Sequence, residues 1–205
     1  MAKNLEPEIV FENNDFLVIN KPAGLDSQNS KESRFSVVEW MRNRYGYAGL
    51  VHRLDLNTSG LMACAKNEKA AKKLTDSLIA GKMRRSYIAV VIGKLPNDQG
   101  QITHELDDKT SLTHYKVAER FANSTLVEVD LETGRKHQIR RHFALEGHPL
   151  LGDHLYKKAG SHLLFNRPAL HAHSLVIDGQ RYQALLPADI VKLVDRLRAV
   201  KSKTP

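Results

Sequence analysis

The sequence predicts an α+β protein, with a mixed, largely antiparallel sheet flanked by helices. Strand-like apolar runs alternate along the chain with segments whose apolar residues recur at helical spacing. There is no repeating βαβ period, internal repeat or low-complexity linker. A chain of 205 residues has the size of one large domain or two small ones. We expect a single domain over 1–205.

Two short strands open the chain. Residues 9–11 and 16–19 are apolar runs, and Asn13-Asn14-Asp15 between them is typical of a turn. We therefore expect an N-terminal hairpin, closed by a second turn over 21–24.

Helices are expected at four places, each with apolar residues on one face. They are 36–44 with a capping box from Ser36 to Glu39, 67–81 with Asn67 as cap and Gly81 as stop, 135–146 stopped by Gly147 and Pro149, and a last helix around 190–197. The tail over 201–205 is expected to fray.

Further strands are expected over 61–65, 87–92 and 126–131. The second is apolar on both faces, which is typical of a central strand, and the third has one polar face. The single cysteine, Cys64, lies in the first of these strands, and we interpret it as a small buried hydrophobe rather than a reactive thiol.

The charge of the chain predicts a polyanionic partner. Thirty-one Lys and Arg against 23 Asp and Glu give a formal net charge of +8, and nucleic acid is the expected polyanion. No apolar run approaches the ~20 residues of a spanning helix, and no signal-like segment is present. One cysteine fits a reducing compartment. We expect a cytoplasmic monomer with no membrane association and no obligate protein partner.

Basic residues cluster in two segments, around Arg85 and around Arg140. Two such patches could bind a phosphate backbone. The alternative for each basic residue taken alone is an ordinary solvent-exposed surface side chain. On a helix Arg140 and Arg141 would be about 100° apart, so they cannot share one role.

The stretch Val51-His52-Arg53-Leu54-Asp55-Leu56-Asn57-Thr58-Ser59-Gly60 carries the chemistry. An acid between a guanidinium and a hydroxyl-rich turn should be ionised and held in place, which makes Asp55 a candidate nucleophile. The alternative interpretation is a turn residue that forms a surface ion pair with Arg53.

The string His-Arg-Leu-Asp-x-x-Thr-Ser-Gly resembles the catalytic signature of the RluA-type pseudouridine synthases. Other blocks of the chain match this family in the same order, and the resemblance covers nearly the whole sequence. They are 20–24 (NKPAG), 85–91 (RSYIAVV), 133–140 (TGRKHQIR), 147–153 (GHPLLGD) and 170–172 (LHA).

The resemblance implies the pseudouridine synthase fold and an isomerase that flips a uridine out of RNA. It implies that Asp55 is the nucleophile, attacking either the ribose or the base, that Tyr87 stacks on the target base and assists proton removal, and that Arg140 is the basic partner of Asp55. Arg53 would enter the RNA helix, and Ile139 would form an apolar floor under the base. Tyr87 and Ile139 also fit ordinary core packing.

Residues expected to contact the RNA are Arg53, Arg85, Arg135, Ile139 and Arg141. Ten histidines invite a metal interpretation, but no metal-binding string is present, and we expect neither metal nor cofactor. A non-catalytic RNA-binding module would explain only the basic patches. A uridine methyltransferase would need a cysteine nucleophile and a cofactor loop.

The target is expected to be a structured stem-loop of transfer or ribosomal RNA. The chain resembles compact family members without an S4 domain. The segment His137-Gln138-Ile139-Arg140-Arg141-His142, with Thr113-His114-Tyr115, is similar to the TruC-like branch, which favours transfer RNA.

Overall fold

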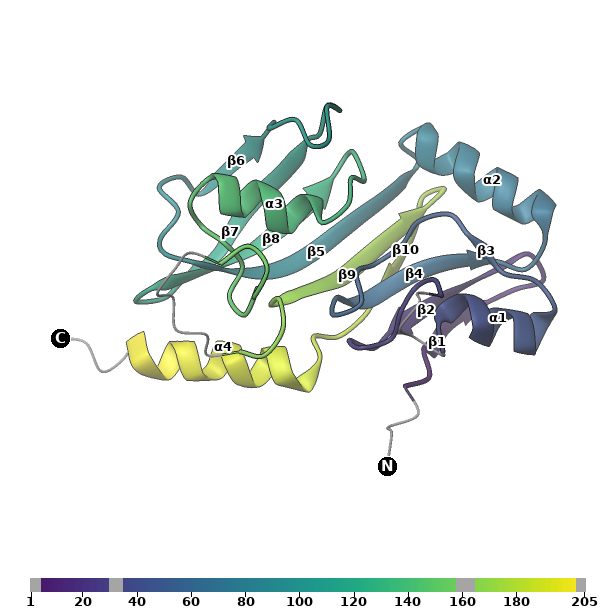
Figure 1. Cartoon of the computed structure of the whole chain (residues 1–205), viewed down its shortest axis with the longest axis horizontal. Helices are drawn as coiled ribbons and strands as arrows, with labels where there is room; N and C mark the ends of the chain where they lie inside the picture. Colours follow the sequence, from purple (N-terminus) through teal and green to yellow (C-terminus); the bar gives the residue numbers. More distant parts are fainter. Residues whose placement is uncertain (1–4, 30–34, 158–164, 202–205) are drawn as a thin grey trace. The chain divides into compact units, whose positions relative to one another are not determined.

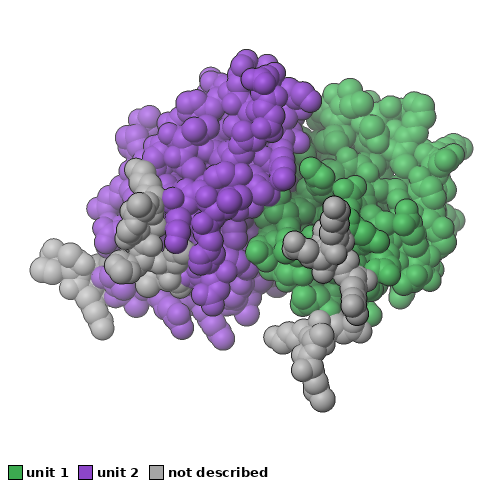
Figure 2. Space-filling view, viewed as in Figure 1, with its two compact units in different colours: residues 1–85, 172–184 green, residues 86–171, 185–205 purple. Residues whose placement is uncertain are grey.

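The computed structural model describes residues 5–29, 35–157 and 165–201. These residues fall into two compact units (Figure 2). Unit 1 comprises residues 1–85 and 172–184, and unit 2 comprises residues 86–171 and 185–205. The chain therefore leaves unit 1 after residue 85, returns to it once over 172–184, and re-enters unit 2 at residue 185. The expectation of a single catalytic domain stays a prediction.

In unit 1, helices lie against strands of the sheet (Figure 1). The elements of unit 1 are β1 (Glu8–Glu12), β2 (Phe16–Lys21), α1 (Val37–Tyr45), β3 (Gly49–Leu50), β4 (Ser59–Ala65), α2 (Glu68–Ile79) and β10 (Gln180–Gln183), together with parts of β5 (Met83–Ile92) and β9 (Leu170–Ile177). β1 and β2 form the predicted antiparallel hairpin, and β2 pairs antiparallel with β4. β9 and β10 form a second hairpin.

Both helix caps predicted in unit 1 are confirmed. Ser36 Oγ accepts a hydrogen bond from Glu39 N at 3.2 Å, and Asn67 Oδ1 accepts one from Ala70 N at 2.8 Å. α2 lies against β4, and its apolar face packs into a core that the side chains of the sheet complete. This core supports β4, which begins directly after the Asp55 loop.

In unit 2, α3 lies against β7 and α4 packs on the hydrophobic core (Figure 1). The further elements of unit 2 are β6 (Gln99–Ile102), β7 (Thr113–Arg120), β8 (Ser124–Leu131), α3 (Gln138–Leu145) and α4 (Ala188–Lys201). β6 pairs antiparallel with β7, and β7 with β8. Within the described residues, four helices and mostly antiparallel strands confirm the predicted α+β class.

Some predicted boundaries were wrong. The helix expected over 135–146 begins at Gln138, because His137 has φ 55° and breaks the helical backbone. The strand expected from Tyr87 begins at Met83, so Arg85 lies on a strand. The last helix reaches Lys201, and the frayed tail predicted over 201–205 stays a prediction because 202–205 lie outside the described residues. Within the described ranges, no helix is long and apolar enough to cross a membrane.

Candidate active site

The predicted site residues are distributed over both units. Asp55, Arg53 and Arg85 belong to unit 1, whereas Tyr87, Arg140 and the other predicted residues belong to unit 2. Each unit holds one of the two charged groups on which the predicted chemistry depends.

The main chain around Asp55 is fixed by hydrogen bonds. Thr58 N donates to Asp55 O at 3.0 Å, which closes a tight turn. Gly24 N donates to Leu56 O at 2.8 Å, and Lys21 Nζ donates to the same oxygen at 3.2 Å. The half-buried Asp55 side chain therefore projects from a backbone held on both sides.

Lys21 is the buried cation beneath this loop. Its side chain is fully buried, and Nζ donates to Pro22 O at 3.1 Å, Leu25 O at 2.7 Å and Leu56 O at 3.2 Å. An ammonium group is tolerated away from water when its donors are satisfied. Lys21 thus ties the turn after β2 to the Asp55 loop, a role that the sequence analysis missed.

His52 anchors the start of the loop as a neutral imidazole. Its Nε2 accepts a hydrogen bond from Ala63 N of β4 at 3.1 Å. Burial, helped by the nearby positive charge of Arg85, lowers the pKa of His52 to about 3. The neutral tautomer therefore carries its proton on Nδ1, and Arg85 lies close to this loop.

β4 leaves the loop through a glycine that cannot be replaced. Gly60 has φ 117°, and a Cβ built there would lie 2.3 Å from Ala172 O. Any side chain would clash with the backbone of β9.

Arg53 is exposed, and its Nη1 lies 3.5 Å from Gln28 Oε1, at the outer limit of a hydrogen bond.

Unit 2 holds Arg140 in a buried ion pair. Arg140 Nε donates to Asp153 Oδ2 at 2.6 Å and Nη2 to Asp153 Oδ1 at 2.9 Å, with side-chain exposures of 10% and 0%. Burial would raise the pKa of Asp153, but the hydrogen bonds and charge of Arg140 outweigh it, with help from the amides of Leu155 and Tyr156, and hold the pKa below 3.8. Asp153 is therefore ionised near neutral pH.

An aromatic ring completes this cluster. The Arg140 guanidinium carbon lies 5.1 Å from the centre of the Tyr156 ring, and Tyr156 Oη lies 2.9 Å from His137 Nδ1. The turn that carries Asp153 depends on Gly152, where a Cβ would meet Arg167 O at 2.0 Å. The sequence analysis did not assign Asp153 or Tyr156 to the site, although Asp153 ends the family-like block Gly147 to Asp153.

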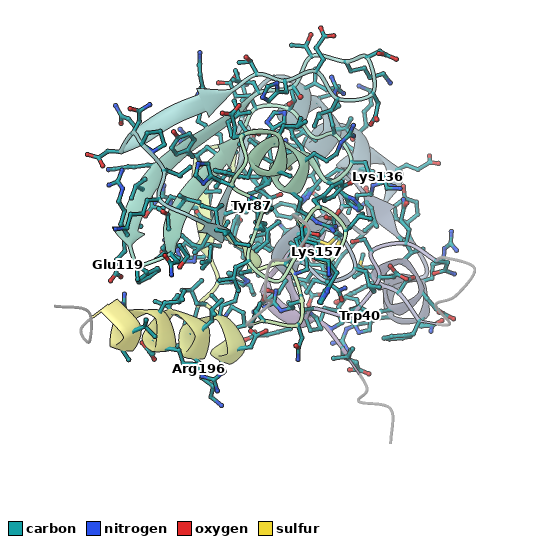
Figure 3. The ribbon with its side chains drawn as sticks, turned by 60° about the vertical axis from the view of Figure 1, so that its left-hand side comes forward. Trp40, Tyr87, Glu119, Lys136, Lys157 and Arg196 are labelled. Carbon is teal, nitrogen blue, oxygen red and sulfur yellow. The ribbon has the colours of Figure 1, made fainter. Side chains whose placement is uncertain are left out.

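Tyr87 and Ile139 are both buried, with exposures of 5% and 3%. Figure 3 shows Tyr87 among the inner side chains, whereas Glu119 and Arg196 lie at the periphery. Ile139 shares α3 with the fully buried Phe143. Their burial fits core packing as well as contact with a base.

Two basic residues near Arg140 form hydrogen bonds to the segment that contains Asp107 and Thr110. Arg135 donates to Thr110 O through Nε at 3.3 Å and Nη2 at 3.1 Å. Arg141 Nη1 donates to Asp107 Oδ2 at 2.9 Å. Arg140 and Arg141 thus have separate partners, as their spacing on a helix predicts.

Neither a metal centre nor a reactive thiol is visible in the described part of the chain. No group of three or more His, Cys, Asp or Glu side chains there could hold a metal ion. Burial raises the pKa of Cys64 to about 12, so its thiol stays protonated.

Comparison with known proteins identifies the family. A family model described as RNA pseudouridylate synthase matches residues 15–145. The chain is 35% identical to the uncharacterized RNA pseudouridine synthase YlyB of Bacillus subtilis, over 97% of this chain and 75% of that protein. It is 36% identical to ribosomal large subunit pseudouridine synthase D of Pasteurella multocida, over 96% of this chain and 72% of that protein.

The fold matches as well. The structure of human RNA pseudouridylate synthase domain containing 4 superimposes with a TM-score of 0.79 at 22% identity, covering 93% of each chain. The family-model match and the two bacterial relatives show that this chain belongs to the RNA pseudouridylate synthase family of isomerases.

Proposed function

We propose that this chain converts specific uridines of a structured RNA to pseudouridine, with Asp55 as the nucleophile and Tyr87 and Arg140 acting on the same uridine. The observation that carries the proposal is the Asp55 loop: within a signature of this family, one carboxylate projects from a main chain fixed by Lys21, Gly24 and Thr58. A rigid support keeps a nucleophile aligned with the bond that it attacks.

The reaction needs neither an oxidant nor an energy source. The bond from ribose C1′ to uracil N1 breaks, the ring turns, and a bond from C1′ to C5 forms, while C5 loses its proton and N1 gains one. Asp55 forms a transient covalent bond with the sugar or the ring, and that bond breaks as the product forms. Base flipping must come first, because these atoms lie inside the stack.

Arg140 is assigned the task of keeping Asp55 ionised. Its pair with Asp153 uses Nε and Nη2, so one edge of the planar guanidinium is fixed and its orientation is set. A cation with a fixed orientation in a partly dry site stabilises charge strongly. Tyr87 is assigned to stack on the base and to accept the C5 proton.

RNA contacts are assigned to Arg53 and to the basic residues of both units. Exposure of Arg53 supports its entry into the RNA helix in place of the flipped base. Phosphate contacts are assigned to Arg85, Arg135 and Arg141. The apolar floor under the flipped base is assigned to Ile139. We also propose that the enzyme acts in the cytoplasm as a monomer.

The substrate is either ribosomal RNA or transfer RNA. Relatives from several bacteria are named for the ribosomal large subunit, which supports ribosomal RNA. The resemblance of 137–142 to the TruC-like branch supports transfer RNA instead. Mapping pseudouridines in both RNA pools of a strain lacking the protein distinguishes them: the pool that loses a modified position contains the substrate.

A release assay tests the reaction itself. Transcripts tritiated at uracil C5 are incubated with the protein and no cofactor, and tritium release is compared with RNA mass. Release at constant mass supports isomerisation. Binding without release would instead indicate an RNA-binding module. A methyltransferase would release tritium only in a parallel reaction with an added methyl donor, with a gain of one methyl mass, although the protonated Cys64 thiol argues against this class.

A further inference from the structure

Ser27 lies beneath the Asp55 loop and has no part in the proposed chemistry. It is 4% exposed, and its Oγ donates to Leu54 O at 2.6 Å while accepting from Leu54 N at 3.1 Å. One hydroxyl therefore satisfies both polar main-chain groups of the residue before Asp55. A hydroxyl is suited to this role because one oxygen both donates and accepts.

This contact constrains Asp55 directly. The carbonyl of Leu54 belongs to the planar peptide unit that contains the nitrogen and Cα of Asp55. Fixing Leu54 N and Leu54 O together restricts rotation on both sides of Leu54, whose side chain is buried in the core. The peptide plane from which the Asp55 side chain projects is thereby fixed.

Ser27 is itself anchored to a helix rather than to a free loop. Val37 N donates to Asp26 O at 2.9 Å, and Val38 N donates to Ser27 O at 3.3 Å. These amides belong to the first turn of α1, whose N–H groups have no partner within the helix. A parallel bridge between Asp26 and Ser36 adds to this support. The constraint therefore runs from α1 through Ser27 to the Asp55 loop.

We propose that Ser27 is a positioning residue, which sets the direction of the Asp55 carboxylate through the Leu54–Asp55 peptide. The inference rests on the proposed function of Asp55. Ser27→Ala removes no charge and no RNA contact. The expected signature is a slower chemical step with unchanged RNA affinity.

The test compares Ser27→Ala, Ser27→Thr and a matched control. Ser174→Ala is the control, because Ser174 is also buried in unit 1 and its Oγ has no hydrogen-bond partner among the described residues. Single-turnover tritium release is measured with enzyme in excess, so that the rate does not depend on the folded fraction. We expect Ser27→Ala to be about 10- to 100-fold slower, with RNA affinity within about twofold.

Ser27→Thr keeps the hydroxyl and should restore most of the rate, and Ser174→Ala should match the wild type. A wild-type rate in Ser27→Ala overturns the proposal. So does an equal fall in Ser174→Ala, or a Ser27→Thr enzyme that melts like the wild type and remains slow.

Hydrogen exchange of the 52–58 peptide separates this inference from the proposed function. Loss of the contact should speed exchange of the Leu54 amide in Ser27→Ala but not in Ser174→Ala. Unchanged exchange overturns the positioning role. A wild-type protein that releases no tritium overturns the proposed function, while the exchange result still decides whether Ser27 holds the loop.

Discussion

The Asp55 loop of unit 1 and the Arg140 cluster of unit 2 each hold one charged side chain, but by different means. Around Asp55 the main chain is fixed, through hydrogen bonds to Leu54 and Leu56 and a backbone turn to Thr58. Around Arg140 the side chain is fixed, by Asp153 and the Tyr156 ring. The main chain that carries Asp55 is held by several separate hydrogen bonds, whereas the Arg140 guanidinium is held mainly by one buried anion.

This difference separates activity from stability. A change to the Asp55 side chain leaves its supporting contacts in place, so it should alter the chemistry and spare the fold. A change to Asp153 leaves a buried cation without its anion, so it should damage the fold as well.

The largest effect is expected from Asp55→Asn. The amide keeps the shape of the side chain and loses the nucleophile, so turnover should fall by roughly a thousandfold or more, while RNA affinity stays within a few-fold. Tritium release and filter binding measure the two quantities. The urea midpoint should stay close to that of the wild type, and turnover near the wild-type rate would remove Asp55 from the mechanism.

Asp153→Ala should be the most destabilising change in unit 2. Removing one partner of a buried ion pair typically costs about 3–5 kcal/mol, because the other charge is left buried. Urea unfolding measures the loss. The double variant Arg140→Met with Asp153→Leu is the control, and it should recover much of the stability but none of the activity. A single variant as stable as the wild type would show that the Arg140 guanidinium finds other partners.

Lys21→Met should test the corresponding support in unit 1. Three carbonyl oxygens would lose the Lys21 donor, and of these Leu56 O keeps its hydrogen bond from Gly24 N, so the cost of about 1–3 kcal/mol for each group left unsatisfied applies to Pro22 O and Leu25 O. Lys72→Met, which removes an exposed pair with Asp76, is the control. Urea unfolding should separate the two clearly, and equal midpoints would contradict a supporting role for Lys21.

The two regions should also respond to acid in different pH ranges. The pKa of His52 is lowered to about 3, so the unfolded chain, with a value near 6.5, binds the extra proton and stability falls as pH drops from about 6.5 toward 3. The slope approaches about 1.4 kcal/mol per pH unit for one proton. His52→Gln should flatten this region in urea unfolding measured against pH.

Asp153 should affect the stability at lower pH than His52 does. Because its folded pKa lies below 3.8, its stabilisation is present above that value and is lost as pH falls through the folded pKa. Asp153→Asn should therefore lower the stability at neutral pH and remove the pH dependence of the stability that the wild type shows below about pH 4. Overlapping profiles for the His52→Gln and Asp153→Asn variants would contradict the separation of the two regions.

The smallest effect is expected from Arg141→Gln. Its exposed pair with Asp107 should add little to stability, and the melting temperature should hardly change. If Arg141 also contacts a phosphate, the slope of log affinity against log salt should fall by about one. Lys192→Gln on α4 is the charge-matched control. An unchanged slope in Arg141→Gln would show that Arg141 pairs with Asp107 but does not contact a phosphate.

Local patterns in the sequence predicted much of the fold. Ser36 and Asn67 cap the helices that their side chains indicated, because capping involves neighbouring residues only. β6 and β7 were missed, since their mixed polar residues gain strand structure by pairing with each other and with β8. The start of α3 was misplaced because the backbone of His137, with a positive φ, overrides the helical pattern.

The sequence by itself determined the family, the family-like motif around Asp55 and the basic charge of the surface, because these are properties of residue type and spacing. Only the tertiary structure decided that Lys21 and Ser27 support the Asp55 loop and that Asp153 holds Arg140. Those contacts join residues far apart in the chain, and no local pattern specifies which distant carbonyl or guanidinium a buried side chain will meet.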